Sequence, residues 1–337
     1  MKAALLSDNY KIQIVNVEKP KIKDSEVLIR VKSNGICGSD LHAYRGHHPF
    51  RKPPVILGHE VSGMVEQLGK SVRNVEIGDR VAVEPQLGCG ECAYCLAGKY
   101  NICVKRAAPG IGSWNGSFAE YFAAPASKVY KLPQDMTYDT GALMEPLAVG
   151  VHAVRRADIK LGDSVAVLGV GTIGLMNLVA AKKAGASRTY ASDLLDYNLG
   201  KARELGADVP INPNKENLIE AVQQRNPYGV DKVIITAAFP PVWEQAVKIC
   251  KRGGRICVVG MFGESVAVDF LQLLLQEKCI CLSWLYRRED FVTAIEIAQA
   301  VNLSPIITHT FPLEDAAKGL QMMDERKQNI VKIILNS

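Results

Sequence analysis

The segment Ser164-Val-Ala-Val-Leu-Gly-Val-Gly-Thr-Ile-Gly174 determines which fold we expect for the second half of the chain. Residues 164–168 form a continuous apolar run, which is typical of a strand that is buried on both faces of a parallel sheet. The glycines predict a tight turn, and the Ala- and Leu-rich residues up to Ala184 predict a helix directly after it. We therefore expect the first strand and helix of a doubly wound α/β sheet.

The same alternation of strand and helix continues along the chain. Short apolar runs predict strands at residues 189–192, 231–236 and 255–260, and helical patterns lie between them at 197–205 and 242–250. Apolar strands separated by helices are typical of a parallel sheet with helices on both faces. The fold class that we expect for this part is α/β.

The first 150 residues follow a different pattern. The segments 26–32 and 79–84 alternate apolar and polar residues, which predicts half-buried strands, and glycines occur between such segments at turn-like intervals. This part is expected to be a β-rich barrel or folded sheet. The last part of the chain, after about residue 285, has two helical patterns and a final strand pattern, at 289–300, 313–325 and 329–335.

Composition excludes several classes of protein. The chain has 337 residues, 48% of them apolar and 22% charged, so it is long enough for two domains and too apolar to be disordered. No run approaches about 18 apolar residues, and the N-terminus becomes charged too early for a signal peptide. We therefore expect a soluble, cytoplasmic protein with no membrane partner. The net charge of +5, spread over this length, indicates no nucleic-acid partner.

The glycine turn has the pattern G-x-G-x-x-G and consists of Gly169, Gly171, Thr172, Ile173 and Gly174, with Val170 between the first two glycines. In a dinucleotide site the first glycine makes the turn, the second leaves room for a pyrophosphate, and the third allows the helix to pack closely on the strand. The N–H groups at the start of the helix then bind the phosphates. The context of strand and helix makes this turn a candidate dinucleotide site.

Asp193 follows the second predicted strand of the α/β part. At about 20 residues beyond the glycines, a carboxylate accepts hydrogen bonds from a ribose 2′-hydroxyl and repels a 2′-phosphate. The position therefore predicts NAD, rather than NADP, as the cofactor. The alternative is a glycine turn of an ordinary α/β sheet with an unrelated surface aspartate.

A cluster of four cysteines predicts a metal site. Cys89, Cys92, Cys95 and Cys103 have the spacing C-x2-C-x2-C-x7-C. Four thiolates complete a tetrahedral zinc shell, so this zinc is expected to hold a loop together and to catalyse nothing. An iron–sulfur cluster and a nucleic-acid-binding zinc ribbon are the alternatives. The nearby basic residues, Lys99, Lys105 and Arg106, are too few to form a nucleic-acid groove.

A second, open metal site is suggested by a thiolate, an imidazole and carboxylates. The candidates are Cys37, His59, Glu60 and Glu145. Such ligands suit zinc, and fewer than four permanent ligands leave a position for a substrate. Each residue also has an ordinary interpretation as a buried cysteine, a hydrogen-bonded histidine or a surface glutamate, and no spacing rule connects them.

Taken together, these motifs resemble the zinc-containing medium-chain dehydrogenases, in their sorbitol dehydrogenase-like branch. The resemblance extends over essentially the whole chain and rests on the two metal motifs, the glycine turn with Asp193, and the segments 35–40 and 145–149. It implies a GroES-like catalytic domain at residues 1–150, completed by residues 285–337, and a Rossmann NAD-binding domain at residues 151–284. It also implies two zinc ions per chain, one catalytic and one structural.

The resemblance also implies roles for individual residues. Catalytic zinc would be held by Cys37, His59, Glu60 and Glu145, with either glutamate binding directly, through water or by exchange. Ser39 would contact the substrate oxygen, and the proton would leave through Ser39, the cofactor ribose and His42. Zinc would act as a Lewis acid on a secondary alcohol, and hydride would pass to the nicotinamide.

The chain departs from sorbitol dehydrogenases at two positions. Ala43 stands where they carry a tyrosine after the relay histidine, and Asn198 replaces a basic residue that often borders the adenosine. Residues 42–50 look more like bacterial dehydrogenases of sugar acids such as gulonate or galactonate. Basic residues that could hold a carboxylate, or be ordinary surface charge, are Arg45, His47, His48, Arg287 and Arg288.

We therefore expect an NAD-dependent zinc enzyme that oxidises a secondary alcohol of a polyol or sugar acid and forms a dimer or tetramer of identical chains. The alternative within the family is a dehydrogenase of the threonine or butanediol kind. A more remote alternative is a non-catalytic zinc-ribbon binding protein.

Overall fold

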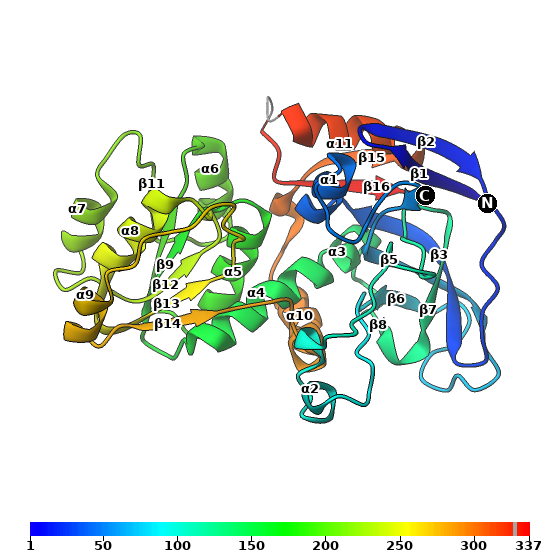
Figure 1. Cartoon of the computed structure of the whole chain (residues 1–337), viewed down its shortest axis with the longest axis horizontal. Helices are drawn as coiled ribbons and strands as arrows, with labels where there is room; N and C mark the ends of the chain where they lie inside the picture. Colours follow the sequence, from blue (N-terminus) through cyan, green and yellow to red (C-terminus); the bar gives the residue numbers. More distant parts are fainter. Residues whose placement is uncertain (326–328) are drawn as a thin grey trace. The chain divides into compact units, whose positions relative to one another are not determined.

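A computed structural model describes residues 1–325 and 329–337 of the chain (Figure 1). The chain forms two compact units. The first consists of Met1–Glu145 and Ala298–Ser337, and the second of Pro146–Ile297. The domain boundaries expected from the sequence, after residue 150 and before residue 285, remain a prediction about domain organisation.

The first unit is mostly β-structure. Its strands are β1(Lys2–Asp8), β2(Lys11–Asn16), β3(Glu26–Gly35), β4(Val55–Ile56), β5(Glu60–Leu68), β6(Arg80–Val83), β7(Tyr121–Pro125), β8(Val129–Lys131), β15(Ile307–Pro312) and β16(Lys332–Asn336). Its helices are α1(Gly38–Tyr44), α2(Ala93–Leu96), α3(Tyr138–Ala142) and α11(Ala316–Glu325), and short 3₁₀ turns lie at η1(Tyr100–Ile102), η2(Ala126–Lys128), η3(Ser304–Ile306) and η4(Leu313–Asp315).

Strand β3 is the central strand of a seven-stranded sheet with the order β15-β16-β3-β5-β6-β8, and β7 also pairs with β3. β5 pairs with β3 antiparallel, with Gly35 opposite Glu60. A Cβ atom at residue 35 would collide with the Glu60 carboxylate, so a larger residue there would displace this side chain. On the other side of β3, β16 places Ile334 opposite Gly35. These pairings bring residues near 37, 59 and 332 together.

The second unit alternates strands and helices. Its strands are β9(Ser164–Leu168), β10(Arg188–Ser192), β11(Val209–Ile211), β12(Val230–Ile235), β13(Cys250–Val258) and β14(Cys279–Leu282). Its helices are α5(Thr172–Lys183), α6(Asp196–Glu204), α7(Leu218–Gln223), α8(Pro240–Ile249) and α9(Phe270–Leu275), together with most of α4(Met144–Ala157) and α10(Arg288–Ala300).

All strand pairs of this second sheet are parallel, in the order β11-β10-β9-β12-β13-β14. This is the doubly wound order 3-2-1-4-5-6, which confirms the expected α/β fold. Every residue of β9 is buried, because helices cover parallel strands on both faces. The carboxyl ends of β9 and β10 lead directly into Gly169 and Asp193.

The predicted elements agree with the structure apart from their ends. The helix expected at 242–250 ends at Ile249, and β13 begins at Cys250, earlier than the strand expected at 255–260. The helix expected at 313–325 starts with a 3₁₀ turn at 313–315. Within the described residues, no helix is long and apolar enough to cross a membrane.

Candidate active site

The open metal motif lies at one end of the β3–β5 pair, where Gly35 of β3 stands opposite Glu60 of β5. The ligand atoms of Cys37, His59 and Glu60 all lie within 4.8 Å of one another. Cys37 caps α1, and its Sγ accepts the backbone N–H of Ser39 at 3.5 Å. His59 and Glu60 are buried at the start of β5. A thiolate, an imidazole and a carboxylate at this spacing fit a zinc ion with a remaining open position.

Asp40 connects the two backbone segments that carry the candidate ligands. Its carboxylate accepts the backbone N–H of Cys37 at 3.0 Å and that of Gly58 at 3.3 Å, so it fixes both segments that carry the ligands. Oδ1 lies 3.4 Å from Nδ1 of the buried His59. Burial raises the pKa of Asp40, but His59 and Arg51 outweigh it and hold the pKa at about 2. The carboxylate is therefore an anion that orients His59.

Lys332, the first residue of β16, forms a buried ion pair with Glu60. Its ammonium group donates to both Glu60 carboxylate oxygens at 2.8 Å and to the Ile36 carbonyl at 3.0 Å. Both side chains are buried, with 3% and 1% of their surface exposed. Burial lowers the pKa of Lys332, but the charge of Glu60 outweighs it, and the pKa is raised. A lysine cation therefore balances part of the negative charge of the metal ligands.

The other predicted residues of this site lie in the same unit. Ser39 is half-buried in the first turn of α1, and its Oγ accepts a hydrogen bond from Arg51 Nη1 at 3.0 Å. His42 is exposed in the last turn of α1. Glu145 is buried in the first turn of α4 and its charge acts on Lys332, but its carboxylate is outside the group of three ligand atoms within 4.8 Å. Its role as a ligand remains a prediction.

The four cysteines of the loop converge as the spacing predicts. Their Sγ atoms all lie within 4.8 Å of one another, with Cys89 and Cys95 3.9 Å apart and Cys92 and Cys103 3.9 Å apart. Four sulfurs around a tetrahedral zinc lie about 3.8 Å apart, so this set fits the ion. Backbone N–H groups of Glu91 and Cys92 lower the pKa of Cys89 to about 6, which favours the thiolate. Cys103 is buried.

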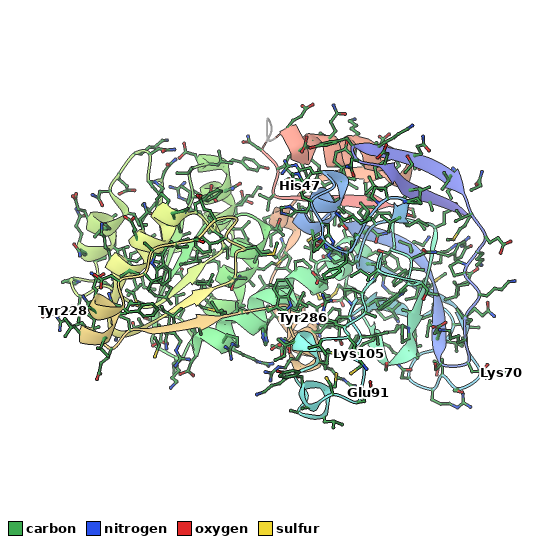
Figure 2. All side chains as sticks on the ribbon, in the orientation of Figure 1. His47, Lys70, Glu91, Lys105, Tyr228 and Tyr286 are labelled. Carbon is green, nitrogen blue, oxygen red and sulfur yellow. The ribbon has the colours of Figure 1, made fainter. Side chains whose placement is uncertain are left out.

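The loop carries the three basic residues Lys99, Lys105 and Arg106. Lys105, labelled in Figure 2, pairs with Glu91 at 2.7 Å, and both side chains are exposed. Lys99 is exposed and Arg106 is half-buried. The expectation that the chain has no nucleic-acid partner stays a prediction.

The glycine turn of the second unit has the geometry of a phosphate site. Gly169 has a φ of +90°, which favours glycine, and a Cβ atom at Gly174 would collide with the Gly169 carbonyl. A Cβ atom at Gly171 would meet nothing within 4 Å, so the space above this residue is open. Thr172 and Ile173 form the first turn of α5, whose N-cap is Gly171 with no side-chain cap. These features fit a pyrophosphate.

Asp193 connects the turn to the end of β10. Its Oδ2 accepts the backbone N–H of Val170 at 2.9 Å, and its Oδ1 accepts that of Leu195 at 3.0 Å. Asn198 is buried nearby in sequence on α6, and within the described residues its Oδ1 has no hydrogen-bond partner. A carboxylate at the end of β10 fits the ribose hydroxyl groups of a dinucleotide.

The basic residues suggested for carboxylate binding have other environments. Arg45 pairs with Asp324 at 2.5 Å. His48 Nδ1 accepts two backbone N–H groups, and burial and the charge of Arg51 lower its pKa to about 4, so it is neutral at pH 7. His47 is exposed on the loop after α1, where Figure 2 labels it. The other two, in the second unit, are the half-buried Arg287, which lies 3.7 Å from Glu289, and the exposed Arg288.

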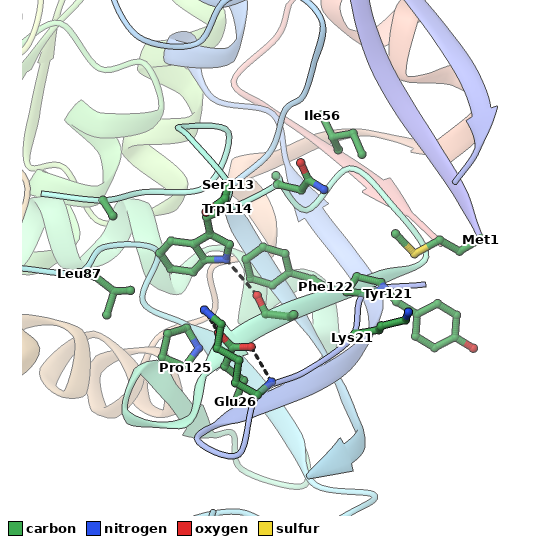
Figure 3. A pocket seen from close by; sticks show the side chains of 16 residues that line it. Met1, Lys21, Glu26, Ile56, Leu87, Ser113, Trp114, Tyr121, Phe122 and Pro125 are labelled. Carbon is green, nitrogen blue, oxygen red and sulfur yellow. Dashed lines mark hydrogen bonds and ion pairs between the residues drawn. The ribbon is translucent and has the colours of Figure 1, made fainter. Parts of the chain in front are cut away.

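The first unit also contains a cavity of about 510 Å³ away from these ligands (Figure 3). Trp114 and Phe122 stack on its wall with ring centroids 6.0 Å apart, and Trp114 Nε1 donates to the Ala123 carbonyl. None of the predicted metal or catalytic residues lines it. This cavity therefore does not belong to the candidate active site.

Comparison with known proteins identifies the family. The GroES-like domain of alcohol dehydrogenases matches residues 23–134, and the zinc-binding dehydrogenase domain matches residues 172–300. An L-threonine 3-dehydrogenase of Bacillus velezensis is 36% identical over 99% of this chain and 98% of its own length. The chain belongs to the zinc-binding dehydrogenase family. This zinc-binding dehydrogenase is thus a zinc-type alcohol dehydrogenase with the predicted GroES-like and Rossmann folds.

Further relatives of this zinc-binding dehydrogenase carry different substrate names. A sorbitol dehydrogenase of Bacillus subtilis is 37% identical, with 99% of this chain and 97% of the relative covered. An L-idonate 5-dehydrogenase of Vitis vinifera is 33% identical, with 94% and 89% covered. A zinc-binding dehydrogenase of Sinorhizobium meliloti, solved with NADP, is 31% identical with a TM-score of 0.94 and covers 100% and 99% of the two chains. These likenesses confirm the family but not one substrate.

Three residues of the metal environment were missed from the sequence. Asp40 stands three positions after Cys37 at the start of a helix, which is the spacing of a capping box and could have indicated it. Arg51 and Lys332 have no such local signal, because the tertiary fold alone brings them to Ser39 and Glu60.

Proposed function

We propose that this zinc-binding dehydrogenase transfers a hydride between NAD and a secondary alcohol of a polyol or sugar acid. The observation that carries the proposal is the group of Cys37, His59 and Glu60 within 4.8 Å, with the hydroxyl-bearing Ser39 two residues after the thiolate. Three ligands leave a fourth zinc position for an alcohol oxygen, which a site of four protein ligands would not.

The bound metal and NAD supply Lewis acidity toward the alcohol and an acceptor for the hydride. The protein supplies the rest. Cys37, His59 and Glu60 would hold the metal, and Asp40, whose Oδ1 lies 3.4 Å from Nδ1, would orient the His59 imidazole. Ser39 would take the alcohol proton at Oγ while its own hydroxyl proton passes to the cofactor ribose, and His42, which is exposed on the same helix, would release a proton to solvent. Glu145 is proposed as a further, exchangeable ligand.

The proposal of NAD as the cofactor rests on Asp193. Its carboxylate is held at the glycine turn by the N–H of Val170, where it would accept the ribose 2′-hydroxyl and repel a 2′-phosphate. The relative that was solved with NADP shows that the family also contains structures with the phosphorylated cofactor. We therefore base the choice of NAD over NADP on Asp193 of this chain and not on the cofactor of a relative.

A polyol or sugar acid is favoured as the substrate class by the relatives named sorbitol and L-idonate dehydrogenases and by the similarity of residues 42–50 to sugar-acid enzymes. A threonine- or butanediol-type activity is the second candidate, because an L-threonine 3-dehydrogenase is equally similar over the whole chain. Both candidates use the same ligands and the same proton path.

The test is NADH formation by the zinc-loaded protein with a panel of polyols, aldonates, threonine and butanediol, run in parallel with NADP. We expect turnover with NAD and a polyol or aldonate. The highest kcat/KM on threonine or butanediol would support the second candidate instead. Metal analysis should give two zinc ions per chain, and one zinc together with no turnover would overturn the proposal.

A homo-oligomer is proposed from the edge of the second sheet. The outer edge of β14 has no partner strand among the described residues, and Ile280 and Leu282 are 39% and 66% exposed there. The α9 residues Phe270 and Leu274 are each 73% exposed. An open strand edge with exposed apolar side chains pairs readily with the same edge of a second copy. Light scattering should show a dimer or tetramer, and Leu282→Lys should shift it toward monomer.

The remaining expectations also stay predictions. The four-cysteine loop is proposed to hold the structural zinc. A cytoplasmic location is proposed because the nine cysteines are free thiols, four of which form the loop site, and a reducing compartment preserves thiolate ligands. Fractionation of cells that express the protein would test the location.

A further inference from the structure

Arg51 is a buried cation beside the hydroxyl of Ser39. It lies on the loop between α1 and β4, and 6% of its surface is exposed. Its Nη1 donates to Ser39 Oγ at 3.0 Å, and its Nε donates to the Pro109 carbonyl at 3.0 Å. Nη1 also lies 3.7 Å from Asp40 Oδ1. The guanidinium is therefore fixed between a backbone carbonyl and the active-site hydroxyl.

We propose that Arg51 is a positioning residue that fixes the Ser39 hydroxyl for the alcohol; this inference rests on the proposed function of Ser39. A guanidinium has only donors, so Ser39 Oγ must be the acceptor of this bond. The hydroxyl proton of Ser39 then points away from Arg51. A hydroxyl that accepts from a cation is also a stronger donor, so it binds an alkoxide better than an alcohol.

The surroundings of Arg51 favour this role over simple packing. Burial of a guanidinium costs several kcal/mol unless charge and hydrogen bonds compensate it. Here the compensation comes from Asp40, whose Oδ1 lies 3.7 Å from the same Nη1, and from the Pro109 carbonyl, which accepts a hydrogen bond from Nε. The backbone closes around it, because a Cβ atom at Gly110 would lie 3.2 Å from Nε. The Arg51 guanidinium therefore has little freedom to move away from the Ser39 hydroxyl.

Neighbouring basic residues do not share the position. Arg45 is paired with Asp324, and His48 uses Nδ1 to accept the N–H groups of Phe50 and Arg51. Lys52, next to Arg51 in sequence, is exposed and donates to the Gly46 carbonyl at 3.1 Å. Lys52 therefore provides a matched control, since it changes the charge of the same loop without a contact to Ser39.

The test is a double-mutant cycle on the zinc-loaded protein. Wild type, Arg51→Met, Ser39→Ala and the double variant are compared for kcat, for KM of the alcohol, for NAD affinity and for zinc content. Arg51→Met should lower kcat about 10²-fold, the effect of a misplaced catalytic group, with KM, NAD affinity and zinc content nearly unchanged. In the Ser39→Ala background the same change should lower kcat less than about twofold, because interacting residues are not additive. Lys52→Met should leave kcat unchanged.

Two results would overturn this inference alone. One is a kcat of Arg51→Met within about twofold of wild type. The other is an equal loss of kcat from Arg51→Met with and without the Ser39 hydroxyl, which marks a structural role. If Arg51→Met does not fold, Arg51→Lys replaces it, because it keeps the charge and loses the fork. An equal loss of kcat from Arg51→Lys in the wild-type and Ser39→Ala backgrounds would again overturn the inference. A wild type without turnover on any alcohol overturns the proposed function and this inference together, whereas an active wild type with additive variants overturns this inference alone.

Discussion

The ammonium group of Lys332 lies 2.8 Å from both carboxylate oxygens of Glu60, although the two residues are 272 positions apart in the chain. Strand β16 thus places a cation in contact with the carboxylate of a predicted metal ligand. The pair is buried, and the same carboxylate contributes to the group of metal-ligand atoms. The charge balance of the site therefore depends on a residue far outside the metal motifs.

Lys332→Met should lower the free energy of unfolding by about 3–5 kcal/mol, because it leaves a buried carboxylate without its partner. Urea unfolding at pH 7 measures the effect. Lys332→Arg should retain most of the stability. Lys131→Met is the matched control, since Lys131 pairs with Asp79 at the same 2.8 Å but is half exposed, and its loss should change stability far less. Equal effects of the Lys332 and Lys131 changes would contradict the prediction.

Cys37→Ser should abolish turnover and leave the protein folded. The change removes a thiolate from the open site, whereas the glycine turn and Asp193 lie in the second unit and should still bind NAD. Zinc content should fall to one ion per chain, and calorimetry should detect NAD binding. Near-normal activity with two zinc ions bound would remove Cys37 from the catalytic site.

Cys95→Ser should lower thermal stability, since it opens a closed set of four sulfurs and a structural zinc contributes folding energy directly. Zinc analysis and the melting temperature measure this effect, and oligomer size by light scattering shows whether assembly is also lost. A variant with wild-type zinc content and melting temperature would show that the loop does not depend on a metal.

Asp193→Gly should raise the KM for NAD about tenfold and relax discrimination against NADP, because a charged acceptor for the ribose is lost. Asp193→Asn separates two effects of this change. Its amide oxygen can still accept the N–H of Val170, so the turn should persist, while the repulsion of a 2′-phosphate disappears. Steady-state kinetics with both cofactors decide the matter, and a wild type that prefers NADP would refute the role of Asp193.

Asp290 should make the second unit sensitive to acid. Burial raises the pKa of Asp290, but hydrogen bonds from His152 at 2.8 Å and from the N–H of Arg287 at 2.8 Å outweigh it, so the pKa is lowered. A lowered pKa in the folded state gives stability that is present above the ordinary carboxyl pKa of about 4 and is lost as pH falls below it. Urea midpoints between pH 7 and pH 3 should fall less steeply for Asp290→Asn. Parallel curves for the two proteins would rule out this contribution.

Local patterns were sufficient for much of this protein. The apolar run 164–168, the glycine turn and the alternation after it predicted the parallel sheet, because strand and helix periodicity depend on neighbouring residues. The spacing of the four cysteines predicted a convergent loop for the same reason, since these ligands lie within 15 residues. The ends of β13 and α11 were less predictable, because tertiary packing decides where such elements begin.

Only the tertiary structure decided the environment of the metal ligands. Cys37 and His59 meet because β3 and β5 pair with Gly35 opposite Glu60, and Lys332 reaches Glu60 because β16 pairs with the other edge of β3. Arg51 reaches Ser39 through a loop whose course no periodicity describes. Sequence determines local conformation through short-range sterics and apolar patterning, but charges that compensate one another across strands are set by sheet register, which forms only when the whole sheet folds.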